Sequence, residues 1–139
     1  PQSNNQAMTA TGMFCRQLDL VPPSDPRMPE GAQALKMRPM SVNNPAYYYV
    51  YYGTLALYQH QGPVWSEWND RLKETLPRLQ NKNGSDAGSW DKGAGHAATG
   101  GRVISTTLAT LSLEVYYRLL PMYGFRNKEA ALPPKKQKL

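Results

Sequence analysis

The sequence predicts an all-α domain of about five helices, in which buried helices alternate along the chain with amphipathic ones. Some segments carry small and apolar side chains around their whole circumference, so they need protein on every side. Others place apolar residues three and four positions apart, with charges on the opposite side. Clusters of Pro, Gly and Asn separate these segments. An inner and an outer layer of helices satisfy this alternation most simply.

The first predicted helix, residues 6–18, has almost no polar face, because its charge is delayed to its last turn. We therefore expect an inner helix, in which Cys15, the only cysteine, is a buried structural residue. A proline-rich break over residues 21–26 follows. The second predicted helix, residues 29–38, is amphipathic and belongs to the outer layer. Its apolar side is formed by Met28, Ala32 and Leu35.

The third predicted helix begins at Asn43-Asn44-Pro45, since asparagine caps free amides and proline is tolerated at the first helical position. Its body, residues 46–58, contains no charged side chain and is rich in tyrosine. Tyrosine favours strands, but the length of the segment and its capping signal favour a helix. A helix without a charged face must be enclosed by protein, so we expect an inner helix here.

The fourth predicted helix opens at Pro63 and is amphipathic. Its core side is formed by Trp65, Trp68, Leu72, Leu76 and Leu79. A loop over residues 81–101, which contains six glycines, follows it. The fifth predicted helix, residues 103–120, is again apolar on all sides. Its Glu114 and Arg118 are spaced for an ion pair on the helix surface.

A weak internal repeat supports the alternation. The segments that end at Gln17 and Gln59, which lie 42 positions apart, both precede a proline-containing turn and an amphipathic helix. This spacing is typical of arrays of helical pairs, which bury their faces against neighbouring repeats. A HEAT-like solenoid is therefore a rival architecture.

The end of the fourth predicted helix and the following loop carry a motif. Gln80 ends the helix and precedes Gly88-x-Trp90, a pattern that resembles the glutamine-tryptophan (QW) motif of squalene and hopene cyclases. In that family the Gln bonds backbone groups of the neighbouring repeat and the Trp ring covers it. The resemblance implies the same roles for Gln80, Gly88 and Trp90. Gly101 and Arg102 resemble the start of the family's next inner helix.

The resemblance covers roughly residues 9–123 and points to the terpenoid cyclase and protein prenyltransferase superfamily. The chain looks closest to bacterial proteins labelled as prenyltransferase and squalene-oxidase repeat proteins. This implies an α/α toroid, a closed ring of paired inner and outer helices. A ring needs more helical pairs than these, and the chain begins at Pro1 rather than at a methionine. We therefore expect residues 1–125 to be the C-terminal part of a toroid.

The catalytic residues of the resembled enzymes are missing from this chain. Hopene-type cyclases protonate an alkene with an Asp-x-Asp-Asp cluster, which does not occur here. The zinc-binding His of the prenyltransferases aligns with Ser105. Asp86 and Asp91 lie in the glycine-rich loop, where we interpret them as turn and capping residues. We predict neither a catalytic residue nor a cofactor within the chain.

The sequence does not predict a metal site either. The residues that could ligate zinc are His60, His96 and Cys15, but their spacing matches no ligand pattern. The glycine-rich segment that ends at Arg102 could imitate a phosphate loop. It lacks the Gly-Lys-Ser/Thr ending, so we interpret it as a structural loop.

The tyrosine-rich third helix is the one feature that could line a ligand site. The candidate residues are Tyr47, Tyr48, Tyr51 and Tyr52. Aromatic side chains at the centre of a toroid could hold an isoprenoid cation or stack on a sugar. The alternative interpretation is core packing, with the tyrosine hydroxyls hydrogen-bonded across the ring.

The net charge of +6 is concentrated at the C-terminal end. Residues 126–139 contain five basic residues and one acid, a net +4, which leaves +2 for residues 1–125. We interpret residues 126–139 as a solvated basic tail, and rank contact with nucleic acid lower. The longest apolar stretch is shorter than the roughly 20 residues that a membrane span requires.

Two functions are consistent with these observations. We favour a non-catalytic scaffold or protein-interaction module built on a squalene-cyclase-like toroid, because the motif residues are present and each known catalytic set is missing. The alternative is a fragment of an isoprenoid-processing enzyme, a terpene cyclase or a prenyltransferase-like protein, whose catalytic residues lie outside this chain. In both cases the apolar ends of the array need covering by another polypeptide, by upstream helices or by a second subunit of an oligomer.

Overall fold

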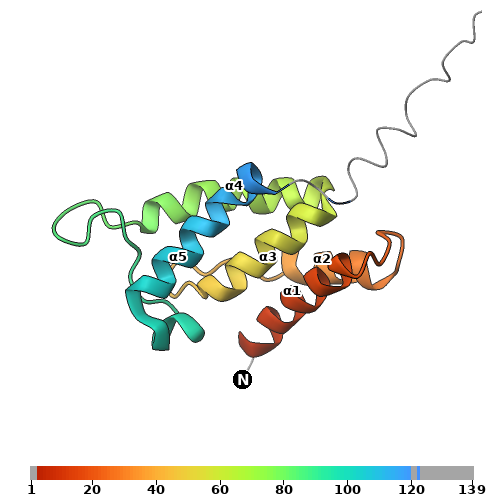
Figure 1. Ribbon diagram of the computed structural model, residues 1–139, viewed down its shortest axis with the longest axis horizontal. Helices are drawn as coiled ribbons and strands as arrows, with labels where there is room; N and C mark the ends of the chain where they lie inside the picture. Colours follow the sequence, from red (N-terminus) through yellow and green to blue (C-terminus); the bar gives the residue numbers. More distant parts are fainter. Residues whose placement is uncertain (1–2, 120–121, 123–139) are drawn as a thin grey trace, which may run out of the picture.

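The computed structural model describes residues 3–119 and Met122, and this part of the chain contains five helices and no strand. The helices are α1 (Ser3–Leu18), α2 (Arg27–Lys36), α3 (Tyr47–His60), α4 (Gly62–Leu79) and α5 (His96–Arg118), as drawn in Figure 1. The all-α prediction is confirmed. None of the five is long and apolar enough to cross a membrane. The predicted basic tail, residues 126–139, lies outside the described residues.

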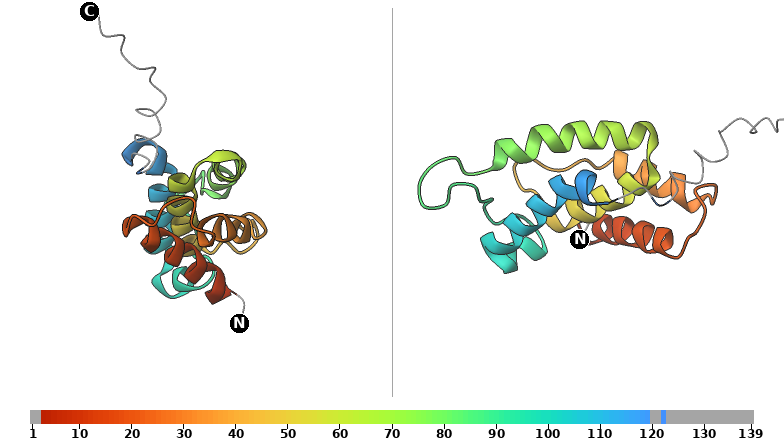
Figure 2. Two further views of the ribbon diagram at one scale, coloured as in Figure 1. Left: turned by 90° about the vertical axis from the view of Figure 1, so that its right-hand side faces the viewer. Right: turned by 45° about the horizontal axis from the view of Figure 1, so that its top comes forward.

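The helices form two layers: α1, α3 and α5 make up one, and α2 and α4 make up the other. Helices α1 and α5 pack on two sides of α3, and within the described residues they do not touch each other. Helices α2 and α4 contact each other and α3. In Figure 1 the helices α1, α3 and α5 run in the same direction, and the end-on view of Figure 2 places α2 and α4 together on one side of α3. A toroid and a solenoid both contain two layers of this kind.

Helix α3 is the core of the molecule. Ten of its 14 residues are buried, so protein surrounds this charge-free helix on most sides as predicted, whereas Tyr48, Tyr51 and Tyr52 are only half-buried. The predicted start at Asn43-Asn44-Pro45 is wrong, because α3 begins at Tyr47 and no side chain caps it. The reason is tertiary: the carbonyl oxygen of Pro45 accepts a hydrogen bond from the backbone amide of Ala94, 3.0 Å away.

The amphipathic predictions for α2 and α4 are confirmed. The apolar side of α2 is buried as expected, at Met28, Ala32 and Leu35. In α4 the buried residues are Trp65, Trp68, Leu72 and Leu76. Leu79, the last residue of the predicted core side, is only half-buried. In both helices the three-and-four spacing of apolar residues correctly identified the side that faces the protein.

The prediction that α1 and α5 are buried on all sides is wrong. Each helix packs against its neighbours on one side only, and its other side is exposed. Met8 of α1 is 69% exposed and Tyr117 of α5 is 84% exposed. Cys15, which was expected to be buried, is exposed as well. The all-round apolar composition of these helices is therefore not matched by protein on all sides.

A glycine interrupts α5 near its beginning. Gly101 has φ +66° and ψ −159°, and a helical turn of residues 96–100 precedes it. A positive φ strains every residue with a Cβ atom, so glycine is the residue that suits this position. The predicted loop up to residue 101 therefore contains one short helical turn. The main part of α5 starts next to the predicted start at residue 103.

The internal repeat corresponds to a repeated hydrogen bond. The side-chain amide of Gln17, near the end of α1, donates to the carbonyl oxygen of Ala56 in α3 at 2.9 Å. The side-chain oxygen of Gln59, near the end of α3, accepts from the backbone amide of Met122 at 2.6 Å, just beyond α5. Both glutamines are buried; the bond of Gln17 is buried as well, whereas that of Gln59 is part-buried. Gln17 thus links α1 to the backbone of α3, and Gln59 links α3 to the chain just beyond α5.

Candidate functional site

Three of the four candidate tyrosines lie together on one side of α3. We call Tyr48, Tyr51 and Tyr52, all half-buried, the tyrosine face. The ring centroids of Tyr48 and Tyr52 are 4.7 Å apart, and those of Tyr51 and Tyr52 are 5.3 Å apart in an edge-to-face arrangement. Tyr51 also lines a groove of about 230 Å³ between α3 and α5. The tyrosine face is therefore a continuous aromatic surface that solvent reaches.

Tyr47 does not belong to this surface. It is 2% exposed and lies in the apolar cluster that contains Leu76 of α4 and Trp90. Burial, and to a lesser extent the charge of Asp91, raise the pKa of Tyr47 to about 12. Of the four candidate ligand-lining tyrosines, Tyr47 therefore packs in the core, in line with the alternative interpretation.

Its surroundings hold the phenol of Tyr52 in the neutral form. Burial raises the pKa of Tyr52, and its hydrogen bond with Tyr48 raises it further. Neutral phenols offer hydroxyl groups and the negative faces of their rings, which attract a cation. They do not supply a strong acid for protonating an alkene. The surface is therefore suited to binding, and the acid for such a reaction has to come from elsewhere.

Two of the residues considered for zinc lie beside the tyrosine face. The ring of His96, at the start of α5, stands edge-on to Tyr48 with centroids 4.9 Å apart. Cys15 of α1 is close enough to act electrostatically on Tyr52. His60 lies at the end of α3, and burial lowers its pKa. Across the part of the chain that the structure describes, no group of three His, Cys, Asp or Glu side chains could hold a metal ion.

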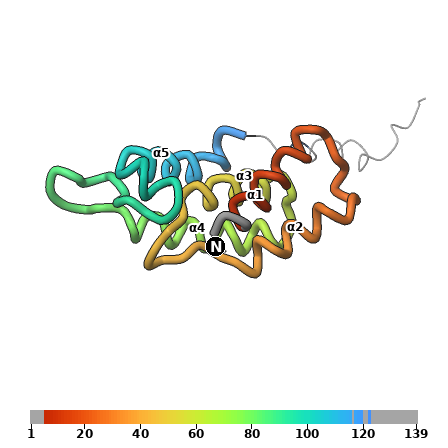
Figure 3. The backbone as a smooth tube through the Cα atoms, turned by 90° about the horizontal axis from the view of Figure 1, so that it is seen from below, coloured from red at the N-terminus to blue at the C-terminus, as the bar shows by residue number. Residues whose placement is uncertain are grey.

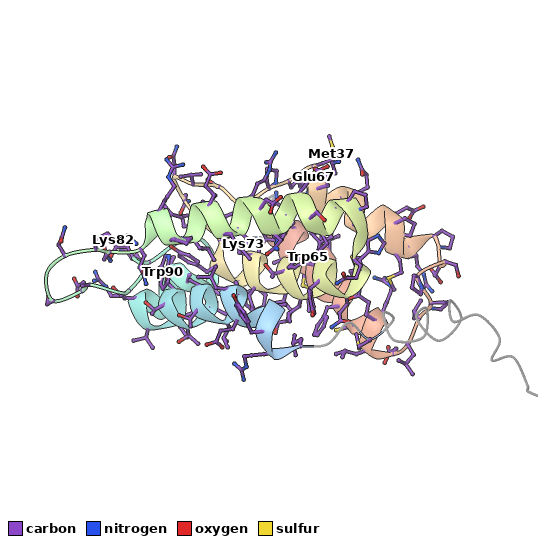
Figure 4. The ribbon with its side chains drawn as sticks, turned by 90° about the horizontal axis from the view of Figure 1, so that it is seen from above. Met37, Trp65, Glu67, Lys73, Lys82 and Trp90 are labelled. Atoms are coloured by element: carbon purple, nitrogen blue, oxygen red, sulfur yellow. The ribbon has the colours of Figure 1, made fainter. Side chains whose placement is uncertain are left out.

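Gln80 and Trp90 fasten the glycine-rich loop to α4. The side-chain amide of Gln80 donates to the carbonyl oxygen of Gly88 at 2.9 Å, which joins the end of α4 to the middle of the loop. Trp90 is 3% exposed, and its indole nitrogen donates to the carbonyl oxygen of Leu76 at 2.7 Å. Gly88 has φ +85°, the left-handed conformation that glycine adopts most readily. Figure 4 shows Trp90 at the end of α4 and Lys82 farther out on the loop.

Arg102 is the centre of an ion cluster at the start of α5. Its guanidinium pairs with the carboxylates of Asp86 and Asp91, the latter at 2.8 Å. Asp86 lies in a turn, as interpreted from the sequence, and the carboxylates of both acids in addition bind a cation across the loop. The pairing also satisfies the charge of Arg102, so this arginine is not available as a phosphate ligand.

The neighbours of the tyrosine face and the ion cluster of Arg102 come together through tertiary packing, so they are difficult to predict from the sequence. His96 and Cys15 come from different helices, and the packing of α1 and α5 on α3 brings them near the tyrosine face. The sequence offered one sign of the ion cluster: Asp91 and Asp86 lie in the glycine-rich loop, 11 and 16 positions before Arg102. Compared with protein-family models, curated proteins and solved structures, the chain gives no match.

Proposed function

We propose that the chain is a structural segment of a larger two-layered helical array, a scaffold that binds another polypeptide along its outermost helices. The toroid implied by the glutamine-tryptophan motif is the arrangement we favour for that array. One observation carries the proposal: α1 and α5 each present an exposed, uncharged row of side chains. The α1 flank consists of Met8, Cys15 and Leu18, and the α5 flank of Val103, Thr107, Thr110 and Tyr117.

Exposed rows of this kind need to be covered. Val103 is 75% exposed and Tyr117 is 84% exposed, although both belong to a helix of apolar composition. The charged pair beside them, Glu114 and Arg118, is joined at 3.0 Å, so it presents no net charge. Exposed apolar residues that gather on one side of a helix, such as Met8 with Leu18 and Val103 with Tyr117, are typical of a protein–protein interface. A further helix beside α1 or α5 would bury each flank as α3 is buried.

The state of association of the purified chain tests the proposal. We expect light scattering and native mass spectrometry to detect complexes whose mass grows with protein concentration. Val103→Asp combined with Tyr117→Asp should return the chain to the mass of a monomer, because a charge in a buried interface is costly. Val42→Asp is the matched control, since Val42 is also exposed and lies on neither flank. A stable monomer with both flanks open to solvent would contradict the proposal.

A second candidate function is a fragment of an isoprenoid-processing enzyme whose catalytic residues lie outside this chain. The half-buried tyrosine face favours it, because phenol rings stabilise a cation without reacting with it. A quaternary ammonium analogue of an isoprenoid cation is the probe. Binding that is lost in Tyr52→Ala and kept in Tyr117→Ala would support this candidate. Equal binding by both variants would argue against it.

A further inference from the structure

A groove on the outer side of α4 is not used by either proposed function. It lies between α4 and the connection from α2 to α3, which runs along α4 in Figure 3. We call it the outer groove; it has a volume of about 180 Å³ and is lined by Pro39, Met40, Val42, Trp68, Arg71 and Leu72. A smaller hollow continues it toward Val64 and Glu67. In Figure 4 Met37 and Glu67 stand beside each other along this edge of α4, away from Trp90.

The floor of the outer groove is apolar and held in place. Trp68 is 6% exposed, and its indole nitrogen donates to the hydroxyl of Thr54 at 2.9 Å. The opposite wall is anchored as well, since the hydroxyl of Tyr49 donates to the carbonyl oxygen of Arg38 at 2.6 Å. Val42 on that wall remains 54% exposed. The groove is therefore preformed, so a ligand does not have to order it on binding.

Arg71 is the one cation that lines both the groove and its continuation without a partner in the described part of the chain. The acids one helical turn away are already paired: Glu67 with Lys36 at 2.9 Å, and Glu74 with Arg78 at 3.1 Å. Arg71 itself is exposed and makes no ion pair with any described residue. Its guanidinium offers a planar pair of donors that match a carboxylate.

We propose that the outer groove binds an extended polypeptide segment that carries a carboxylate next to an apolar side chain. The apolar side chain rests on Trp68 and Leu72, and the carboxylate pairs with Arg71. Val64 and Thr75, the two ends of the α4 lining, are 11 helical steps or about 16 Å apart. An extended segment of about five residues covers that length. The length of the lining and the single unpaired cation favour an acidic peptide over a polyanion, which needs several cations.

Binding of labelled peptides tests this inference, which rests on the proposed function only in that a scaffold binds polypeptides. The probe is a fluorescein-labelled peptide of alternating leucine and glutamate with blocked ends, about eight residues long. Companion peptides of alternating leucine and lysine, and of alternating serine and glutamate, separate the acidic from the apolar requirement. We expect the leucine–glutamate peptide to bind tightest by fluorescence anisotropy. The signal of the Trp68 indole should shift in the NMR spectrum when it binds.

Arg71→Glu should lower the affinity for the leucine–glutamate peptide by about tenfold or more, because it turns the attraction between Arg71 and the peptide carboxylate into a repulsion. Lys92→Glu makes the same charge change outside the groove, at an exposed residue that pairs with no described acid, and should change the affinity by less than about twofold. Arg71→Gln, which only removes the charge, should have an intermediate effect. Circular dichroism melts should confirm that all three variants are folded, since Arg71 and Lys92 are both exposed.

Three results would overturn the inference. The leucine–lysine peptide could bind as tightly, Arg71→Glu could leave the affinity unchanged, or a single-stranded oligonucleotide could bind better than the peptide. Two variants separate this inference from the scaffold proposal. Val42→Asp should weaken peptide binding and leave self-association intact. Val103→Asp with Tyr117→Asp should abolish self-association and leave peptide binding intact. Failure of one proposal is therefore distinguishable from failure of the other.

Discussion

The indole nitrogen of Trp90 donates a hydrogen bond to the carbonyl oxygen of Leu76, 2.7 Å away. Leu76 lies in the last turn of α4, where backbone carbonyls have no partner within the helix. Trp90 therefore satisfies one of these carbonyls and at the same time packs its ring into the core. The bond is buried, so its loss leaves a polar group without water or protein.

Trp90→Phe should lower the free energy of unfolding by about 1–3 kcal/mol, because the ring stays apolar while the Leu76 carbonyl loses its donor. Trp65→Phe is the matched control. Trp65 is also buried, and within the described residues its indole nitrogen makes no hydrogen bond. Urea unfolding of both variants measures the difference. Equal losses in the two variants would mean that the hydrogen bond contributes nothing.

Gly53→Ala should destabilise the protein by about 1–3 kcal/mol, since a methyl group cannot fit there. A Cβ atom at Gly53 would lie 2.9 Å from Cζ2 of Trp68, a ring that is fixed by its bond to Thr54. Gly12→Ala, also inside a helix, should instead stabilise by about 0.5–1 kcal/mol. Its added Cβ would meet only Nη1 of Arg16 at 3.5 Å. Thermal melts that change in the same direction for both variants would contradict this account of Gly53.

The stability of the protein should fall as the pH rises from about 10 toward 12. The pKa of Tyr47 is raised to about 12 in the folded chain, while an unfolded tyrosine titrates near 10. The unfolded state therefore releases its proton first, which favours unfolding in this pH range. Below pH 10 the contribution of Tyr47 is fully present. Tyr47→Phe should make the loss between pH 10 and pH 12 shallower in urea unfolding curves, and an unchanged slope would contradict the prediction.

The ion pair of Arg102 with Asp91 should give a coupling energy of about 0.5–1 kcal/mol in a double-mutant cycle at low salt. Both side chains are partly exposed, so salt should reduce the coupling. The pair of Arg118 with Glu114 within α5 is the control, and should give about 0.3–0.5 kcal/mol. A coupling at Arg102 no larger than this would mean that the ion cluster does not hold the loop.

The sequence predicted the helices well because helix formation depends on local pattern. Three-and-four spacing identified the buried sides of α2 and α4, and the absence of charge identified α3 as enclosed on most sides. The predicted pair of Glu114 and Arg118 is also confirmed, at 3.0 Å, since residues four apart in a helix always face each other. Each of these predictions concerns residues within a single helix.

The tertiary structure alone decided which of these elements meet. It separated Tyr47 from the tyrosine face, moved the start of α3 to Tyr47, and paired Arg102 with two acids of the preceding loop. It also left one side of α1 and of α5 exposed, although their composition resembles that of α3. The physical reason is that an apolar side chain is more stable when buried, whichever apolar residue covers it. The packing of distant segments determines which residue that is, and local periodicity does not predict it.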